Sequence, residues 1–189
     1  MKTIILNASP RTKGNISNMV SIIANNITDK SSYEIVNINE LTLKPCVGCM
    51  KCRSLDKCVL PTDDAHIVGE KIKEADNIIV ASPTYWANMP GNLKILFDRN
   101  VFLFMEESKR GYPIGRLKGK KGFIITTCST AFPWNVVFKQ SSGLVRSVEE
   151  IFKAGGIKIG GVVALPGTKS LNKIPPNTIN KLNKIARLL

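Results

Sequence analysis

Short apolar runs alternate with amphipathic segments along the whole chain. Five runs predict β-strands, and four of them are almost continuously apolar: Thr3–Ala8, Asn77–Ala81, Gly122–Thr127 and Ile157–Ala164. The fifth run, Tyr33–Ile38, alternates apolar with polar residues. Continuously apolar strands are typical of a parallel sheet covered on both faces, so this pattern indicates a buried sheet.

Between these runs, apolar residues recur at the spacing of one helix face. They are Ile16, Met19, Val20, Ile23 and Ile27; Val68, Ile72 and Ala75; Leu144, Val148, Ile151 and Phe152; and Ile179, Leu182, Ala186 and Leu189. A further helix is expected over residues 92–99. Five strand–helix units in succession predict an α/β fold, with a parallel sheet and helices on both faces.

Two insertions interrupt the alternation, at residues 43–62 and 101–120. The first is rich in cysteine, and the second begins with the apolar run Val-Phe-Leu-Phe-Met. That run could complete a core helix, cover a ligand or form a subunit contact. No repeat or linker divides the sequence, so we expect one domain over residues 1–189 with two insertions.

The formal charge of +13 favours anionic partners. Residues 109–121 contain no acid and carry a cluster of cations: Lys109, Arg110, Arg116, Lys118, Lys120 and Lys121. The cluster is either a solvated loop or a docking surface for a dinucleotide phosphate or an acidic redox partner. No nucleic-acid-binding motif is present, so no specific nucleic-acid partner is expected.

No apolar run is long enough to cross a membrane, and the first strand is too short for the core of a signal peptide. We therefore expect a cytoplasmic protein without a membrane partner. In that compartment the five cysteines indicate free thiols, metal ligands or redox groups, and not a secreted disulfide framework.

The segment Ser9–Ser17 joins the first strand to the first helix. Its hydroxyl, amide and backbone N–H groups at a helix N-terminus are suited to an anion, and Arg11 and Lys13 add positive charge. Neither the Rossmann nor the Walker glycine pattern is present, which favours a monophosphate over a pyrophosphate or triphosphate. Helix capping by Asn15 or Ser17 is the simpler alternative.

A second loop, Ser82–Gly91, follows the third strand and carries the adjacent aromatics Tyr85 and Trp86. It lies at the carboxyl end of a strand, where open α/β sheets bind ligands. Small residues beside aromatic ones suit a planar ring such as a flavin. Together the two loops could hold one ligand by its phosphate and its ring.

These two loops, with Leu93-Lys94 and Phe97-Asp98-Arg99, resemble the NAD(P)H-dependent FMN reductase family of the flavodoxin-like superfamily. The resemblance implies a flavodoxin-like three-layer sandwich whose five-stranded parallel sheet has the order 2-1-3-4-5. It also implies that FMN phosphate is held by Ser9, Arg11, Asn15, Ile16 and Ser17, with Lys13 nearby. The isoalloxazine would be lined by Pro83, Thr84, Tyr85, Trp86, Asn88 and Met89, and approached by the loop of Cys128, Ser129 and Thr130.

The cysteine insertion spaces Cys46, Cys49, Cys52 and Cys58 as C-x₂-C-x₂-C-x₅-C. Three cysteines at three-residue intervals can bind the corners of one cubane, whereas structural zinc more often uses two separated pairs. The loop resembles that of the iron–sulfur flavoproteins, a branch of the same family, which implies a [4Fe-4S] cluster near the flavin. Structural thiols or a reversible disulfide are the alternatives.

Few acid–base residues accompany these loops. His66 is the only histidine and is expected at the surface or as a helix cap, near Asp63 and Asp64, which favour the helix N-terminus. Asp98 and Arg99 are expected to pair with each other. The sequence therefore contains no hydrolytic constellation, as is usual for an enzyme whose chemistry is carried by its flavin.

Two functions follow from the resemblance. The first is a ping-pong reductase, in which NAD(P)H passes hydride to bound FMN and the reduced flavin serves a small-molecule acceptor such as a flavin, a quinone or a nitro compound. The second is an electron carrier that links ferredoxin, an acidic redox protein, to a [4Fe-4S] cluster and FMN. The resemblance also implies a homodimer or homotetramer.

Overall fold

The fold is built on one five-stranded parallel sheet. The computed structural model describes residues 1–189, apart from the side chain of Ser31. The strands of this sheet are β1 (Thr3–Asn7), β2 (Tyr33–Asn37), β3 (Asn77–Pro83), β6 (Lys121–Thr127) and β7 (Lys158–Leu165). Their spatial order is β2-β1-β3-β6-β7, and every pairing is parallel. Counted along the chain this is the predicted order 2-1-3-4-5, which is confirmed.

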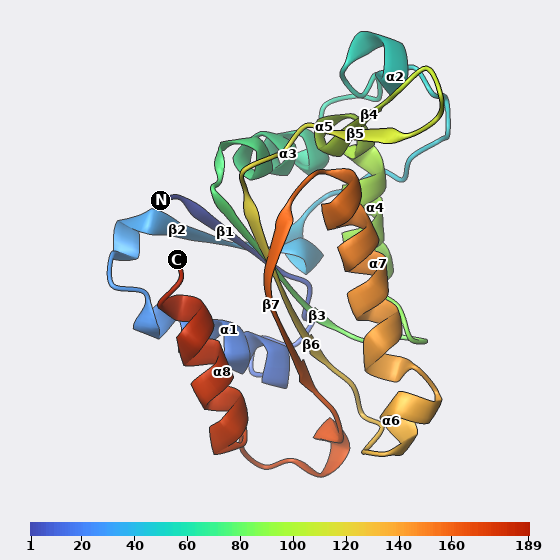
Figure 1. The fold of residues 1–189 in the computed structure, drawn as a ribbon. Coiled ribbons are helices and arrows are strands. Elements are labelled where there is room, and N and C mark those ends of the chain that lie inside the picture. Colours follow the sequence, from blue (N-terminus) through green and yellow to red (C-terminus); the bar gives the residue numbers. More distant parts are fainter.

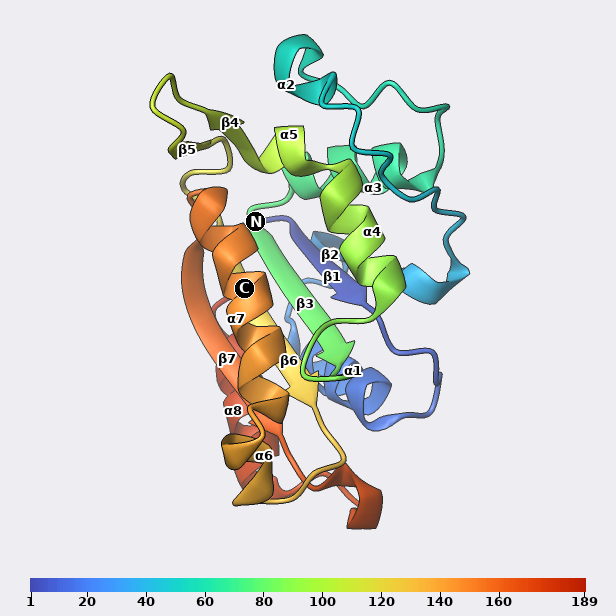
Figure 2. The ribbon, with the colours of Figure 1, turned by 90° about the vertical axis from the view of Figure 1, so that its right-hand side faces the viewer.

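Helices cover both faces of the sheet (Figures 1 and 2). On one face lie α1 (Asn15–Asn26) and α8 (Pro176–Ala186), and on the other lie α3 (Asp64–Glu74), α4 (Gly91–Arg99) and α7 (Gln140–Ala154). The strands supply both cores by alternation. For example, Ile5 joins the core under α1 and α8, while Ile4 and Leu6 join the core under α3, α4 and α7.

Short elements complete the chain. They are the helices α2 (Cys52–Leu55), α5 (Val101–Phe104) and α6 (Trp134–Val137), the strands β4 (Met105–Glu107) and β5 (Pro113–Gly115), and 3₁₀ turns at Lys30–Ser32, Ile38–Glu40 and Thr168–Ser170. β4 and β5 form a separate antiparallel hairpin. In both views this hairpin and α2 lie beyond one end of the sheet, opposite the carboxyl ends of β3 and β7 (Figures 1 and 2).

The apolar start of the second insertion enters the core. Leu103 and Phe104 are buried, and the Phe104 ring meets Phe97 edge-on with centroids 5.6 Å apart. Of the three alternatives for this run, the structure therefore favours a core helix, α5. The described residues contain no helix that is long and apolar enough to cross a membrane.

The basic cluster of residues 109–121 does not form one continuous free surface. Arg116 lies 2.8 Å from both Asp56 and Glu106, and these contacts raise its pKa, with the Glu106 hydrogen bond as the main cause. The Lys120 amine donates to the carbonyls of Lys73 and Ala75, and burial lowers its pKa. Lys109 and Arg110 remain exposed at the hairpin tip.

Candidate functional site

A cavity of about 790 Å³ opens where the strands end. The loops after β1, β3, β6 and β7 all contribute to its wall. The residues that line it are Ser9, Pro10, Arg11, Thr12, Lys13, Gly14, Asn15, Ile16, Asn18, Pro83, Thr84, Tyr85, Thr127, Cys128, Ser129, Thr168, Leu171 and Asn172. The structure thus brings the two sequence-predicted loops into one cavity.

The loop after β1 is ordered by its own hydroxyl groups. The Ser9 and Ser17 hydroxyls donate to the Arg11 carbonyl at 3.0 and 2.8 Å, and the Arg11 N–H donates back to Ser9 Oγ at 3.2 Å. The next residues start α1, whose N-cap is Gly14, with no capping side chain in the described chain and no acid in the first turn. Because nothing acidic competes there, the first N–H groups of α1 are suited to an anion.

The loop after β3 is held at two places. Thr84 donates its N–H to the Thr127 carbonyl at 2.9 Å, and its hydroxyl lies 2.9 Å from that of Thr126. Farther out, Tyr85 and Asn88 exchange two backbone hydrogen bonds of 2.9 Å across a tight turn. The turn residues Trp86 and Ala87 are left-handed, with φ of 51° and 58°, and the Trp86 side chain is 98% exposed.

Ten of the expected flavin residues line this cavity. They are Ser9, Arg11, Lys13, Asn15, Ile16, Pro83, Thr84, Tyr85, Cys128 and Ser129. The other five are not part of the lining: Ser17, Trp86, Asn88, Met89 and Thr130. The Ser17 hydroxyl donates to the Arg11 carbonyl of the loop after β1, and Met89 is buried in the core. Trp86 stands at the tip of the turn, outside the lining.

Sequence reasoning does not identify the contribution of the segment after β7. Thr168, Leu171 and Asn172 complete the wall, and the Thr168 hydroxyl donates to the Cys128 carbonyl at 3.1 Å. The carboxyl ends of neighbouring parallel strands meet at one edge, so the position of these residues after the last strand is the signal that could have found them.

The residues of the cavity fit FMN. One end offers an uncapped helix N-terminus beside Arg11 and Lys13, which suits a monophosphate. The other end offers Pro83, Thr84 and Tyr85 beside Cys128 and Ser129, which together form a wall against which a flat ring can lie. The loops at the two ends follow the adjacent strands β1 and β3 and their neighbour β6, so they lie along one edge of the sheet.

A second cavity, of about 80 Å³, is lined by all four cysteines of the first insertion. We call it the cysteine cavity. Burial raises the pKa of the Cys52 thiol, and the nearby thiols of Cys46, Cys58 and Cys49 raise it further. All five cysteines of the chain are free, and among the described residues no group of three or more His, Cys, Asp or Glu side chains is arranged to hold a metal ion. The four thiols therefore line one cavity, but they are not arranged as the ligands of one metal site.

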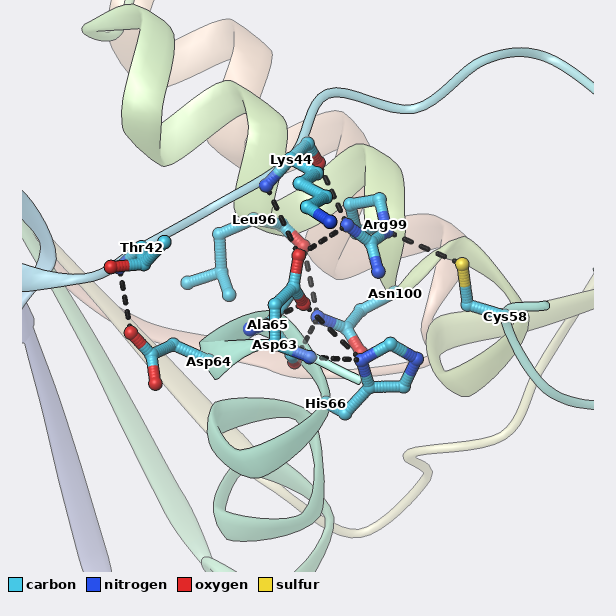
Figure 3. Close-up of polar contacts among 10 residues, drawn as sticks. All are labelled: Thr42, Lys44, Cys58, Asp63, Asp64, Ala65, His66, Leu96, Arg99 and Asn100. Atoms are coloured by element: carbon cyan, nitrogen blue, oxygen red, sulfur yellow. Dashed lines mark hydrogen bonds and ion pairs between the residues drawn. The ribbon is translucent and has the colours of Figure 1, made fainter. Parts of the chain in front are cut away.

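A buried ion pair borders the cysteine cavity (Figure 3). Arg99 Nη1 lies 2.6 Å from Asp63 Oδ2, and both side chains are almost fully buried. Although burial opposes ionisation of Asp63, the N–H of Lys44 and the guanidinium of Arg99 outweigh it and lower its pKa. The expected pairing of Arg99 with Asp98 is wrong, because Asp98 faces outward and pairs with Lys94 one turn back on α4.

The single histidine is a helix cap, as expected. His66 Nδ1 accepts the Asp63 N–H at 3.2 Å, while Asp63 Oδ1 accepts the Ala65 N–H at 3.1 Å. Together they form a capping box at the start of α3. This geometry leaves His66 no part in either cavity.

Comparison with known families gives one broad match. The model of the family described as NADPH-dependent FMN reductase matches residues 1–141. Among curated proteins, an iron-sulfur flavoprotein of Methanocaldococcus jannaschii is 37% identical over 101 residues, which cover 53% of this chain and 52% of that protein. An iron-sulfur flavoprotein of Methanosarcina thermophila is 38% identical over 105 residues, 54% of each. The chain thus spans about half the length of the curated relatives it matches.

Solved structures share the fold over nearly the whole chain. An FMN-dependent NADH-azoreductase from Bacillus anthracis, solved with FMN, has a TM-score of 0.75 at 16% identity and covers 100% of this chain and 99% of its own. An NAD(P)H:quinone oxidoreductase from Methanothermobacter marburgensis has a TM-score of 0.73 at 16% identity, covering 99% and 94%. At such identities the likeness concerns the fold alone.

Proposed function

Because the chain belongs to the NADPH-dependent FMN reductase family, we propose that it is an FMN-dependent oxidoreductase that takes hydride from NAD(P)H and reduces a small acceptor. The observation that carries the proposal is the cavity at the carboxyl edge of the sheet, in which the basic loop after β1 and the aromatic loop after β3 meet. Flavins, quinones and azo or nitro compounds are the acceptor classes that suit a flavin carrier.

The phosphate end of the cavity would bind FMN through the N–H groups that open α1. Arg11 and Lys13 add charge, and Ser9 and Ser17 keep the Arg11 carbonyl turned away from the anion by hydrogen-bonding to it. Asn15 and Asn18 supply further amide groups on the wall. This arrangement would favour a flavin with a phosphate over riboflavin.

At the ring end of the cavity, the side chains would hold the flavin ring in position and take no part in the redox reaction. Thr84 is fixed to β6 by two hydrogen bonds, so Pro83, Thr84 and Tyr85 present a firm wall to a flat ring. Bound FMN would supply the redox chemistry, accepting a hydride and releasing electrons singly or in pairs. The indole of Trp86, in the same loop, is exposed and would stack on a nicotinamide or an aromatic acceptor.

The test is reconstitution with FMN followed by anaerobic addition of NADH or NADPH. Rapid bleaching of the flavin band, and parallel lines in initial-rate plots, are the expected results for one ring surface used in turn by donor and acceptor. Intersecting lines would instead require donor and acceptor to be bound together, and a protein that retains no FMN would refute the proposal.

The cysteine cavity favours a second candidate function, that of an electron carrier with a [4Fe-4S] cluster. Cys46, Cys49, Cys52 and Cys58 all line one cavity, which supports them as the ligands. The exposed cations of the cysteine loop, Lys51 and Lys57, suit an acidic partner such as ferredoxin. Iron and acid-labile sulfide in anaerobically purified protein, with bleaching only by reduced ferredoxin, would select this function over the first.

We further propose that residues 1–189 act as one FMN-binding domain in a homodimer or homotetramer. Support comes from apolar residues on and beside α6, where Phe132, Trp134, Val136, Val137 and Phe138 are all exposed. Light scattering of the FMN-loaded protein tests the assembly, and a strictly monomeric mass at micromolar concentration would rule it out.

A further inference from the structure

Arg99 is the last residue of α4 and lies in the wall of the cysteine cavity. Its side chain has no exposed surface. A guanidinium is rarely buried so completely unless its charge and its N–H groups are used by the fold. The partners of Arg99 therefore show what it does (Figure 3).

One guanidinium holds both ends of the cysteine loop. Nη1 donates to the Lys44 carbonyl at 2.7 Å, two residues before Cys46, and Nε donates to Cys58 Sγ at 3.2 Å. Nη1 also pairs with Asp63 Oδ2 at 2.6 Å. The start of the loop, its last cysteine and the cap of α3 thus meet at a single side chain.

The residues around this meeting point are themselves fixed. Asp63 Oδ2 accepts the Lys44 N–H at 3.1 Å, and Asp64 Oδ2 accepts the Thr42 N–H at 2.6 Å, so the chain entering the loop is bound to the start of α3. Asn100 joins α4 to α3 by donating to the Ala65 and Leu96 carbonyls at 2.9 and 3.0 Å. The segments that Arg99 contacts are therefore held in place by other hydrogen bonds.

The guanidinium also has a free donor. Nη2 is buried and has no hydrogen-bond partner among the described residues. An unpaired N–H of a buried charged group is costly, so it indicates a partner that arrives with a ligand. Arg99 itself lines the cavity of four thiols, where thiolate and sulfide are the acceptors that a bound cluster would bring.

We propose that Arg99 is a positioning residue that holds Cys58 and the start of the cysteine loop so that the four thiols enclose one metal-binding cavity, and that donates N–H bonds to the sulfur atoms there. The inference rests on the proposed cluster function and adds a residue outside the cysteine motif. Lysine could replace the charge toward Asp63 but not the planar fork that reaches Lys44, Asp63 and Cys58 together.

The experiment compares the wild type with Arg99→Lys, which keeps the charge beside Asp63, and with Lys94→Gln, which removes an exposed cation from the same helix. The probe is Co²⁺ added anaerobically to the reduced protein, followed by its thiolate-to-cobalt absorption. Loss of a group that orients a metal ligand typically weakens metal binding by about 10- to 100-fold, and we expect this for Arg99→Lys. Lys94→Gln should bind Co²⁺ as the wild type does, and all three should bind FMN equally.

A second readout follows reconstitution with iron and sulfide. Hydrogen bonds to cluster sulfur atoms help set the reduction potential, because they stabilise the more negative reduced state. Any cluster that forms in Arg99→Lys should therefore have a lower potential than in the wild type. A side chain that only supported the fold would leave this potential unchanged.

The outcomes separate the inference from the function on which it rests. Wild-type protein that binds Co²⁺ but takes up no iron and sulfide would refute the cluster, and Arg99 would then be judged on Co²⁺ affinity alone. Equal Co²⁺ affinity in Arg99→Lys and the wild type would overturn the positioning role, as would a parallel loss of FMN binding and thermal stability. A wild type that binds neither metal would overturn both.

Discussion

Gly143, near the start of α7, has only a hydrogen where other residues carry Cβ, and the tip of the aromatic loop rests on it. A Cβ at this position would lie 3.1 Å from both the carbonyl carbon and the Cβ of Ala87, and would overlap the Ala87 carbonyl oxygen. Gly143→Ala is therefore a test of whether α7 positions the aromatic loop, Ser82–Gly91, for FMN binding.

Two effects of this substitution oppose each other. Alanine is favoured over glycine inside a helix by about 1 kcal/mol, which would stabilise α7. The overlap with Ala87 costs about 1–3 kcal/mol, as for other overpacked sites. The overlap acts on the loop, because α7 is anchored by the buried Leu144 and Val148 while the turn holds itself by the two hydrogen bonds between Tyr85 and Asn88.

There is a second reason to expect that the turn moves and α7 does not. Trp86 and Ala87 are both in the left-handed region, which typically stores about 1–3 kcal/mol of strain at non-glycine residues. Displacing the turn far enough to clear the Ala87 carbonyl oxygen moves Tyr85 on the cavity wall. If the overlap cost of about 1–3 kcal/mol falls on the FMN-bound loop, the Kd for FMN rises about 5- to 150-fold.

The assay is quenching of FMN fluorescence on titration, together with thermal unfolding of the FMN-free protein. Ser142→Ala is the matched control, because Ser142 is exposed on the same turn of α7. Its FMN affinity should equal that of the wild type. A Gly143→Ala protein that binds FMN within about twofold of the wild type and unfolds at a higher temperature would refute the reasoning.

Three further predictions concern charged residues. Asp63→Asn should lower the free energy of unfolding by about 3–5 kcal/mol at neutral pH, because it leaves Arg99 buried without its partner. Folding lowers the pKa of Asp63, so ionised Asp63 stabilises the fold above the ordinary carboxyl range, and this stabilisation is lost as pH falls through the lowered pKa. Urea titrations from about pH 7 to about pH 3 should therefore show a steeper loss of unfolding free energy in the wild type than in the variant. Arg11→Gln should raise the Kd for FMN about tenfold and leave that for riboflavin unchanged, because only FMN carries the phosphate; equal losses for both ligands in calorimetry would count against the phosphate site. Arg116→Gln should cost less than about 1 kcal/mol in chemical unfolding, since both its acidic partners, Asp56 and Glu106, are largely exposed, and a larger cost would mean that the hairpin supports the core.

Much of the fold is predictable because its signals are local. The apolar runs correspond to β1, β3, β6 and β7 within one or two residues, and the alternating run is the edge strand β2. The inner strands β1, β3 and β6 are buried, as their apolar sequences predict, whereas β7 is the other edge strand and is exposed along much of its length although its sequence is apolar. The hairpin β4–β5 is not predicted, because three-residue strands leave no periodic signal.

The candidate site is predictable in part for a similar reason. Loops that follow parallel strands must gather at one edge, so Ser9–Ser17 and Ser82–Gly91 can be paired from the order of the strands along the chain. The segment of Thr168, Leu171 and Asn172 escapes such reasoning because it has no distinctive composition, and its place in the cavity depends on how β7 ends.

The sequence by itself determined the alternation of strands and helices, the two loops of the cavity and the presence of four closely spaced cysteines, because these depend on residue type and spacing along the chain. Only the tertiary structure decided that Arg99 pairs with Asp63, that Arg116 and Lys120 bind groups of the same chain, and that Gly143 packs against Ala87. Each of these contacts joins residues on different elements, or depends on where a long side chain finds its partner. Such contacts depend on tertiary packing, which local sequence patterns do not encode.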